Sequence, residues 1–522
     1  MTADPSPEAP SQPDAGVSSL KEGPGHEGRL MARPVSLDTF RENVVLLARD
    51  SLALRPERLA GLRRVELRLD GRSILAAPII CDDPGLVGPS EAGLPEPAMR
   101  RLGAQAGQWI AIAPATRPRS LDAVRAKISG ETLGEADYAE VARDLAAHLW
   151  SDMEIAAFLV ACASFMTTEE TVSLTRGMIA AGSRIDWKGG LVVDKHCIGG
   201  IPGNRTSLIV APIAAAHGLL VPKTSSRAIT SPAGTADTME VLARVDLGFD
   251  EMRAVVERCG ACIVWGGRVN ISPADDVLIS VERPLKIDTP EQMVASILSK
   301  KIAAGSTHLV LDIPVGPTAK VRDREAARRL RKLFEHVAGS LGLNIDVVLT
   351  EALQPIGRGV GPVLEARDVL CVLDNAPGAP ADLREKAIVL AGRMLECDPD
   401  LRGGQGARRA RELLESGAAR RKLDQIIEAQ GASPLKAVLG GLVHEVRAPA
   451  DGHVGAIDCL RIATIARLAG APTDPGAGVE ILARLGEKVR AGEPLYRIYA
   501  SEAFDFTLAA EAAQEGSGIS LA

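Results

Sequence analysis

The residues best placed to do chemistry lie where a short apolar strand, Leu191–Val193, should end. They form a charged triplet followed by glycines: Asp194, Lys195, His196, Gly199, Gly200 and Gly203. A helix is expected to begin near Thr206. Glycines at a strand-to-helix turn let backbone N–H groups point into one small space, and the N-terminus of the helix adds a partial positive charge. With the full charge of Lys195, this segment predicts a binding site for an oxyanion.

A second polar segment follows the next apolar strand. It reads KTSSRAITSPAGT and runs from Lys223 to Thr235. Clusters of Gly, Ser and Thr are most often simple turns. Two such clusters, each after a strand and each carrying Lys or Arg, instead favour one site for a phosphate and a phosphorylated or sugar-bearing partner. The first segment is not a Walker loop, because Asn204 and Arg205 occupy the positions of its second glycine and its lysine.

These motifs carry a family resemblance. The pattern DKH-x-x-GG from Asp194, followed by S-x-R and SPAGT, resembles the thymidine/pyrimidine nucleoside phosphorylases. The longer form, GG-x-PGNRTS with KTSSRAITSPAGTADTMEV, is similar to the branch that contains archaeal AMP phosphorylases and bacterial proteins called type-2 thymidine phosphorylases. The resemblance extends from about Arg33 to about Ser501. It implies a pentosyltransferase in which inorganic phosphate attacks the anomeric carbon of a nucleoside while the nucleobase leaves.

The substrate has two candidates. The family name implies thymidine and phosphate, giving thymine and 2-deoxyribose 1-phosphate. The branch leaves open the nucleoside 5′-monophosphates AMP, CMP and UMP, giving ribose 1,5-bisphosphate, since extra Ser, Thr and Lys contacts can hold a 5′-phosphate. Phosphate is a co-substrate in both reactions, so neither a cofactor nor a metal is expected.

Two other classes of function are weighed against this interpretation. A phosphoribosyltransferase of the anthranilate-using kind shares the fold but requires a pyrophosphate-and-magnesium site, and the glycine segment has no acidic pair beside it. A non-catalytic carrier or binding scaffold is suggested by the C-terminal region alone, where the expected hairpin tip reads Asp451-Gly452 instead of a carrier lysine. The glycine run Gln354–Pro362 either faces the site or forms a turn.

Phosphorolysis requires a closely held phosphate and a proton or cation for the leaving base, with preorganised charges supplying most of the acceleration. The resemblance assigns phosphate contacts to Lys195, Gly199, Gly200, Ser207, Ser225 and Thr235. It assigns substrate contacts to Gly200, Ser226, Arg227, Ala228, Ile229, Thr230, Ser231, Thr235, Ser296, Lys300 and Lys320. Lys195 and His196 are expected to act in catalysis. Cys197 stands where relatives commonly have a phosphate-contacting serine, so either one hydrogen bond is lost or a backbone N–H replaces it.

Asp288 is the expected proton donor, because AMP phosphorylase relatives use the aspartate at this position. The segment Asp288-Thr-Pro-Glu also reads as a helix start, with Asp or Thr as the cap. A carboxyl group that is protonated near neutral pH needs an apolar or anionic surround that raises its pKa. Ser296 and Lys300 lie on one face of the following helix, although Lys300 and Lys301 also read as a solvated helix end. Arg283 is two residues out of register with the arginine that pyrimidine relatives place upstream.

Composition excludes several classes of protein. The formal charge of −7 argues against a surface that coats nucleic acid. No apolar run reaches the ~18 residues of a membrane span, and the N-terminus lacks the pattern of a signal peptide, so a cytoplasmic protein without membrane partners is expected. The eight cysteines are scattered, and the pair Cys259 and Cys262 has no second pair or histidines at ligand spacing. Buried, reduced thiols are therefore expected.

The expected fold class is α/β. It combines a helical domain and a mostly parallel mixed-sheet domain with a small β-rich N-terminal domain and a C-terminal barrel-sandwich-like α+β domain. The expected ranges are 1–32 for a disordered tail, 33–118 for the N-terminal domain, 119–186 for the helical domain with a later return of the chain to it, 187–432 for the phosphate- and substrate-binding α/β domain, and 440–505 for the C-terminal domain. The resemblance also implies a homodimer in which the helical layer makes the contact.

Local patterns predict individual elements of these domains. Helices are expected at Tyr138–Leu149, Asp152–Cys162 and Thr168–Ala181, the last of them capped by Thr168. Strands are expected at RRVELRLDG and SILAAPII in the N-terminal domain, and at LVVD, LLVP, CIVWGG, VLIS, HLVLDIPVG and VVLT in the α/β domain.

Overall fold

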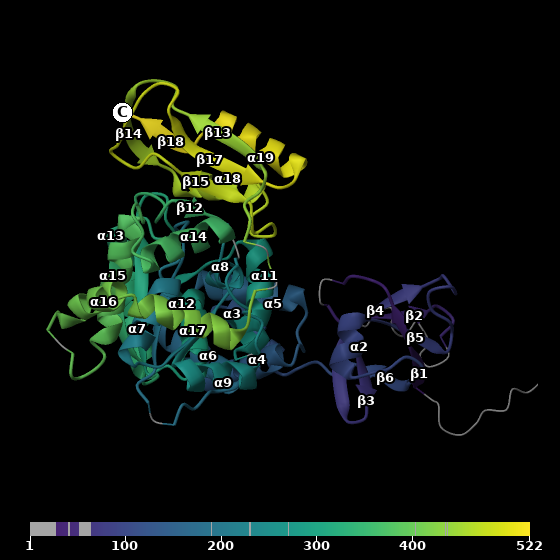
Figure 1. The fold of residues 1–522 in the computed structure, drawn as a ribbon. Helices are drawn as coiled ribbons and strands as arrows, with labels where there is room; N and C mark the ends of the chain where they lie inside the picture. The colour runs from purple at the N-terminus through teal and green to yellow at the C-terminus, as the bar shows by residue number, and fades with distance from the viewer. Residues whose placement is uncertain are drawn as a thin grey trace, which may run out of the picture. The chain divides into compact units, whose positions relative to one another are not determined.

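The computed structural model describes residues 28–39, 42–51, 64–188, 190–228, 231–269, 271–401, 403–433, 435 and 437–522. The chain divides into two compact units, Met1–Arg117 and Pro118–Ala522, whose elements are labelled in Figure 1. Most of the expected tail lies outside the described residues. The end of the expected tail was predicted wrongly. Strand β1 begins at Arg29 and buries Leu30 and Ala32 in the core of the first unit.

The first unit is a closed six-stranded barrel with the strand order β1-β5-β2-β4-β3-β6. Apolar side chains alternate into its interior, as the period of a half-buried strand requires. The turn between β3 and β4 places Asp70 and Gly71 at φ values of 46° and 78°, which suits a two-residue hairpin loop. Its elements are β1 (Arg29–Val35), β2 (Val44–Ala48), β3 (Val65–Leu69), β4 (Arg72–Cys81), β5 (Glu91–Pro95), α2 (Glu96–Leu102) and β6 (Trp109–Pro114).

The second unit begins with a helical bundle formed by α3 (Leu121–Ile128), α4 (Glu135–Ala146), α5 (Asp152–Ser164) and α6 (Thr168–Ala180). The predicted helices are present, but the cap of α6 is Thr167, one residue before the predicted Thr168. Thr167 accepts a hydrogen bond from the Glu170 backbone N–H, and the Glu170 carboxylate accepts one from the Thr167 N–H, which is a complete capping box.

The chain returns to this bundle in α11 (Pro273–Leu285), whose apolar side chains enter the bundle core. The run VLIS, predicted as a strand, lies inside this helix. The prediction was wrong because a four-residue apolar run does not distinguish a strand from a buried helix. The helix is specified by Pro273 at its first turn and by Ala274, Leu278 and Val281, which are spaced to face the bundle.

A parallel sheet forms the centre of the α/β domain. Strands β7 (Val193–Cys197), β10 (His308–Val315) and β11 (Asn344–Glu351) pair in parallel in the order β11-β10-β7. Strands β8 (Val221–Ser225) and β9 (Ala261–Trp265) form a second parallel pair. A parallel bridge between Val192 and Leu220 joins the two groups. The carboxyl ends of β7 and β8 therefore lie at one edge of the sheet, as the sequence predicted for an α/β domain.

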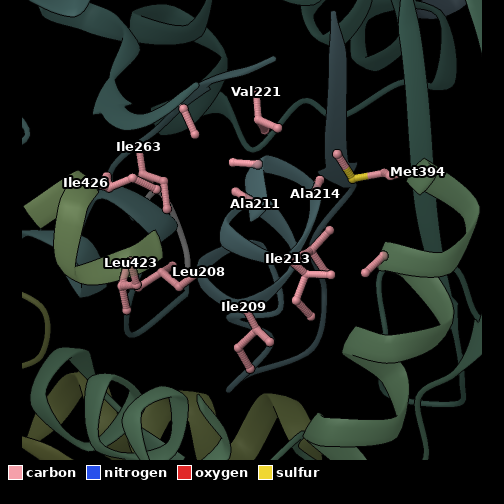
Figure 2. Close-up of a cluster of buried hydrophobic side chains, with 14 of the residues drawn as sticks. Leu208, Ile209, Ala211, Ile213, Ala214, Val221, Ile263, Met394, Leu423 and Ile426 are labelled. Atoms are coloured by element: carbon pink, nitrogen blue, oxygen red, sulfur yellow. The ribbon is translucent and has the colours of Figure 1, made fainter. Parts of the chain in front are cut away.

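Helices cover this sheet and bury α7 (Ser207–His217) from Ser207 to Ala215. Figure 2 shows the labelled apolar side chains of α7 in the centre, with those of β9 and α17 on the left, that of β8 above and that of α15 on the right. A helix that is apolar all round is stable only in such a buried position. The other helices are α8 (Thr235–Glu240), α9 (Phe249–Cys259), α10 (Gly266–Val269), α12 (Pro290–Ala303), α13 (Arg324–Ser340), α14 (Pro362–Leu373), α15 (Ala381–Leu395), α16 (Gln405–Glu415) and α17 (Ala418–Gln430).

The C-terminal domain contains two antiparallel sheets, ordered β12-β15-β17-β13 and β16-β14-β18. It extends beyond the predicted end at residue 505, because α19 packs on it and β18 pairs with β14. At the predicted tip, Asp451 accepts a hydrogen bond from the Ala491 N–H at 2.7 Å. The elements are β12 (Gly359–Val360), β13 (Leu442–Arg447), β14 (Gly452–Ile457), α18 (Cys459–Leu468), β15 (Gly478–Ile481), β16 (Lys488–Val489), β17 (Pro494–Ala500), α19 (Ala503–Glu515) and β18 (Ile519–Leu521).

No helix in the described part of the chain is both long enough and apolar enough to cross a lipid bilayer.

Candidate active site

The glycine loop, defined as residues 198–206, connects the end of β7 to the start of α7. Gly200 has a φ of 88°, and a Cβ built on it would lie 2.4 Å from the backbone nitrogen of Lys320. Gly203 has a φ of 77°, and its Cβ would lie 2.3 Å from the Ile356 carbonyl oxygen. Both positions therefore need glycine for conformation and for close packing. The contact with Lys320 joins two segments that are far apart in the sequence.

Lys195 points into the protein beneath this loop, and its residue is 2% exposed. Its ammonium donates a hydrogen bond to the Thr206 hydroxyl at 2.7 Å, and that hydroxyl donates to the Asn204 side-chain oxygen at 3.1 Å. Burial lowers the pKa of Lys195 from its ordinary value. Thr206 was not among the predicted phosphate contacts, whereas the predicted Ser207 is buried at the first residue of α7. The side-chain partner of the Lys195 ammonium is therefore Thr206, which the sequence analysis did not name as a contact.

A buried carboxylate supports the loop from the neighbouring strand. Asp312 on β10 pairs with Lys386 at 2.9 Å and accepts hydrogen bonds from Thr350 at 2.6 Å and from Asn204 at 3.1 Å. Burial raises the pKa of Asp312, but Lys386 and Lys195 outweigh burial and keep the pKa below its ordinary value. None of these partners was predicted, because they come from three separate elements.

The thiol of Cys197 takes part in the same network. Its sulfur accepts hydrogen bonds from the Asn204 side-chain N–H at 3.0 Å and from the Gly199 backbone N–H at 3.4 Å. Burial raises the pKa of the thiol to about 11, so it stays neutral at physiological pH. Cysteine at this position therefore holds the loop as an acceptor.

His196 is half-buried among cations. Burial, followed by the charges of Lys301, Lys223 and Lys195, lowers its pKa well below the ordinary value. The imidazole is therefore neutral near pH 7 in the ligand-free protein. The sequence named His196 as a catalytic residue, and its neutral form can position a substrate or accept a proton.

A cluster of two lysines and one aspartate lies behind His196. Asp194 pairs with Lys301 at 2.7 Å and with Lys223 at 3.4 Å, and both lysines donate to the Thr224 carbonyl oxygen. Lys301 is 2% exposed, so the alternative of a solvated helix end is wrong for this residue. Burial lowers the pKa of Lys223 to about 7 against the opposing effect of Asp194.

The second polar segment begins inside β8, next to β7, and continues past the end of that strand. Arg227, a predicted substrate contact, pairs with Glu240 at 2.7 Å and with Asp237 at 3.3 Å, and it lies over the ring of Trp265. Its guanidinium is thus held by protein groups. The Ala228 N–H donates to Asp237 at 2.7 Å, which fixes the backbone of the segment.

The remaining members of this segment differ in accessibility. Ser225 donates to the Val264 carbonyl at 3.3 Å, and Ser231 donates to the Ala233 carbonyl at 3.0 Å. Ser226 is exposed, and Thr235 is half-buried at the first residue of α8. The predicted contacts Ile229 and Thr230 lie outside the described residues.

The other end of the site contains the predicted acid and its neighbours. Asp288 pairs with Lys320 at 2.6 Å. It does not cap α12, because Thr289 is the cap and accepts the Gln292 N–H. Since the backbone of Lys320 packs against Gly200, this pair lies beside the glycine loop. The sequence analysis required an apolar or anionic environment that would raise the pKa of the acid. The neighbour of the Asp288 carboxylate is instead the ammonium of Lys320.

Ser296 and Lys300 meet on one carboxylate. Ser296 donates to Asp275 on α11 at 3.0 Å, and Lys300 forms an ion pair with the same oxygen. The predicted common face of α12 therefore holds α11 in place. Burial raises the pKa of the nearby Glu282 to about 7, with further contributions from Asp275 and Asp288. The sequence analysis missed Glu282, although its position two helical turns after Asp275 was a usable signal.

The glycine run Gln354–Pro362 packs behind the glycine loop. Arg205, fully buried, donates to the carbonyl oxygens of Ile356 and Gly359 and pairs with Glu365 at 2.7 Å. The sequence left open whether this run faces the site or only forms a turn. Its described contacts with Arg205 support the glycine loop from behind. Arg283, the weak match to an arginine of pyrimidine relatives, is exposed on the last turn of α11.

Three family models match consecutive parts of the chain. The helical bundle domain of a glycosyl transferase family matches residues 121–182, and its α/β domain matches residues 189–420. The C-terminal domain of pyrimidine nucleoside phosphorylases matches residues 453–520. Proteins named "Putative thymidine phosphorylase" are similar over nearly the whole length. Those of Rhodopseudomonas palustris and of Bradyrhizobium sp. strain BTAi1 are each 59% identical over 492 residues, which is 94% of this chain and 96% of theirs.

The chain belongs to the thymidine/pyrimidine nucleoside phosphorylase family. A more distant relative of the same name, from Albidiferax ferrireducens, is 53% identical over 497 residues, covering 94% of this chain and 95% of that protein. Among solved structures, anthranilate phosphoribosyltransferase from Thermus thermophilus is similar, with a TM-score of 0.49 and 23% identity over 59% of this chain and 99% of that one. The family makes this phosphorylase a pentosyltransferase that acts on a nucleoside and phosphate, and the predicted α/β fold class is confirmed.

Proposed function

We propose that this phosphorylase cleaves thymidine with inorganic phosphate, giving thymine and 2-deoxyribose 1-phosphate. The observation that carries the proposal is the arrangement of Lys195 and Thr206 at one edge of the sheet, beside a glycine loop in which Gly199 has open space at its Cβ position. Relatives of 59% identity that bear the name thymidine phosphorylase support the choice of substrate.

Phosphate would bind where a buried cation and loop N–H groups converge. Lys195 supplies the charge, while the network of Asp312, Lys386 and Asn204 keeps the loop in shape. Preorganised charges of this kind lose little energy to reorganisation when the negative charge shifts during the reaction. An incoming dianion also favours protonation of His196, whose neutral form is maintained by burial and nearby lysines.

The sugar and base would occupy the space between the second polar segment and the cluster around Lys320. Exposed Ser226 and half-buried Thr235 offer hydroxyl groups on one side, and Lys300 and Lys320 lie on the other. The resemblance assigns the proton for the leaving base to Asp288. In the structure the carboxylate of Asp288 pairs with Lys320 at 2.6 Å.

A nucleoside 5′-monophosphate is the second candidate substrate, on the basis of the hydroxyl-rich second segment. The engagement of Arg227 by two carboxylates favours thymidine, because this guanidinium is not free to hold a 5′-phosphate. The test is a phosphate-dependent assay with thymidine, uridine, AMP and CMP. Release of thymine that requires phosphate supports the proposal, and faster cleavage of AMP or CMP than of thymidine would replace it.

A further inference from the structure

The Thr206 hydroxyl lies at the start of α7 but does not cap that helix. Thr206 is the N-cap residue and is buried, and none of the described backbone N–H groups of the first turn donates to its side chain. A threonine at this position usually accepts the N–H of the second or third helical residue. Here the hydroxyl instead accepts a hydrogen bond from the Lys195 ammonium at 2.7 Å and donates one to the Asn204 side-chain oxygen at 3.1 Å. The hydroxyl therefore serves the buried cation and not the helix.

The direction of each hydrogen bond in this chain of side chains follows from its chemistry. An ammonium can only donate, so the Thr206 oxygen accepts from Lys195 and its own proton goes to the Asn204 oxygen. The Asn204 amide nitrogen donates to the Asp312 carboxylate at 3.1 Å and to the Cys197 sulfur at 3.0 Å. Turning this amide over would place its oxygen against an ionised carboxylate, which has no proton to donate. The amide therefore has one favourable orientation, and the Thr206 hydroxyl has one direction in which to donate.

Asp312 is held on its other side by groups from other elements. Lys386 on α15 pairs with it at 2.9 Å, and Thr350 on β11 donates to it at 2.6 Å. Because Asp312 is completely buried, its charge must be paired and its oxygens hydrogen-bonded. Asn204 supplies part of this bonding. The orientation of the Asn204 amide is thus set by a carboxylate that is anchored in the sheet.

The Lys195 ammonium has capacity for further acceptors. An ammonium carries three N–H groups, and within the described part of the chain its hydrogen-bond acceptor is Thr206. Lys195 is buried, and buried donors need partners. Lys195 and Lys386 both lower the pKa of one carboxyl group, that of Asp312, so these three side chains together carry a net positive charge. A buried lysine with remaining donors in a group of net positive charge is suited to an anionic ligand.

We propose that Asn204 and Thr206 are positioning residues, which hold the Lys195 ammonium so that its remaining N–H groups face the bound phosphate. This role rests on the proposed phosphorylase function, in which phosphate binds at the glycine loop. Asp312 orients the Asn204 amide, the amide orients the Thr206 hydroxyl, and the hydroxyl holds one N–H group of the lysine. A donor held in this way need not reorient when negative charge moves during the attack of phosphate.

The first experiment replaces the Thr206 hydroxyl by a methyl group. Thr206→Val is expected to raise the KM for phosphate about 10–100-fold and to leave the KM for thymidine nearly unchanged, because a hydrogen bond to a charged group is lost. Thr206→Ser keeps the hydroxyl and is expected to stay close to the wild type. Thr175→Val is the matched control, since it removes an equally buried hydroxyl that donates to the Thr171 carbonyl oxygen within α6. An unchanged KM for phosphate in Thr206→Val, or an equal loss in Thr206→Ser, would overturn the proposal.

The second experiment tests whether Asn204 acts through Thr206. Asn204→Asp keeps an oxygen that can accept from Thr206 but loses the N–H groups that bond to Asp312 and Cys197. It is therefore expected to raise the KM for phosphate as much as Asn204→Ala does. The double variant Asn204→Ala/Thr206→Val is expected to be no worse than the worse of the two single variants, because both changes break one chain. A normal KM in Asn204→Asp, or additive effects in the double variant, would contradict the proposed chain.

Equilibrium binding separates this proposal from the proposed function. Inorganic phosphate is titrated into each protein in a calorimeter, with and without an unreactive thymidine analogue. The wild type and Thr175→Val are expected to bind phosphate about 10–100-fold more tightly than Thr206→Val. Equal binding by the wild type and Thr206→Val would make the positioning role wrong, while phosphate-dependent release of thymine would still support the phosphorylase function. If the wild type binds no phosphate and releases no thymine with it, the proposed function fails and the positioning role fails with it.

Discussion

Lys195 is the residue whose replacement should separate phosphate use from folding. Its ammonium is buried, donates to Thr206 at 2.7 Å and faces the glycine loop. Lys195→Ala is expected to cost about 2–4 kcal/mol of transition-state stabilisation, because a desolvated charge next to the developing oxyanion is lost. The measurement is kcat/KM for phosphate. Lys332→Ala, an exposed change on α13, is the control and should leave the rate unchanged. Near-normal activity of Lys195→Ala at low phosphate would contradict a phosphate site at this loop.

The sequence was informative for residues that belong to contiguous motifs. Lys195 and the glycines were recognised because a strand, a charge and a turn follow one another along the chain. The partners that complete the network, such as Thr206, Asp312 and Lys386, have ordinary local sequences. They come together only when β10 and α15 pack beside β7. Glu282 was missed in part for the same reason, since its environment includes Asp288, Lys300 and Lys320 from outside α11.

At the scale of the element, the glycine loop depends on one close approach. Gly199 and Gly200 have nearly the same φ, 87° and 88°, but only Gly200 faces another backbone, that of Lys320. Gly199→Ala adds only the strain of a left-handed residue, about 1–2 kcal/mol. Gly200→Ala adds the same strain and also displaces the segment that holds Asp288. Its kcat/KM is therefore expected to fall well below that of Gly199→Ala, which is the matched control. Equal activities would show that the contact with Lys320 has no role in the site.

Element boundaries were predictable where the signal is local. The start of α6 was placed within one residue, because Thr167 and Glu170 form a capping box inside the helix itself. The run VLIS was misassigned because its conformation depends on packing against α4 and α5, which no local pattern contains. The length of the C-terminal domain was underestimated for a similar reason, since β18 is a short strand defined by its pairing with β14.

At the scale of the whole molecule, the C-terminal domain supports the site through the α/β domain. Strand β12 pairs with β15, and Arg484 contacts Asp382 and the carbonyl oxygen of Gly357. Asp368 accepts the backbone N–H groups of Arg358 and Gly359 at 2.8 Å. These contacts fix the segment on which Arg205 and the glycine loop rest. This arrangement gives a structural role to a domain that lacks a carrier lysine.

The homodimer implied by the family resemblance is expected to form through the helical bundle, where large apolar side chains are exposed. Val160 on α5 is 53% exposed and Phe165 is 51% exposed. Burying one apolar side chain stabilises an interface by ~1.5–3 kcal/mol. In a symmetric dimer each substitution occurs twice, so a buried charge at Val160 should weaken the free energy of dimer formation by several times that amount. Val160→Glu is expected to give a monomer by light scattering. Phe504→Glu, at an exposed position on α19, is the control and should leave the dimer intact. A monomeric wild type would contradict this prediction.

Catalysis is expected to require closure of the helical bundle toward the sheet. Helix α11 packs against α4 and α5 and carries Asp275 and Glu282, whereas Lys195 belongs to the sheet. Substrate contacts held by the bundle and a phosphate site on the sheet must come together with water excluded, because charges act strongly only in a dry site. Solution scattering with phosphate and an unreactive thymidine analogue should therefore show a smaller radius of gyration than the free enzyme. Lys195→Ala, which is expected to bind phosphate poorly, should not contract at the same ligand concentrations. If saturating ligands leave the wild-type radius unchanged, the two parts are already in their reactive arrangement and closure is not a step of the reaction.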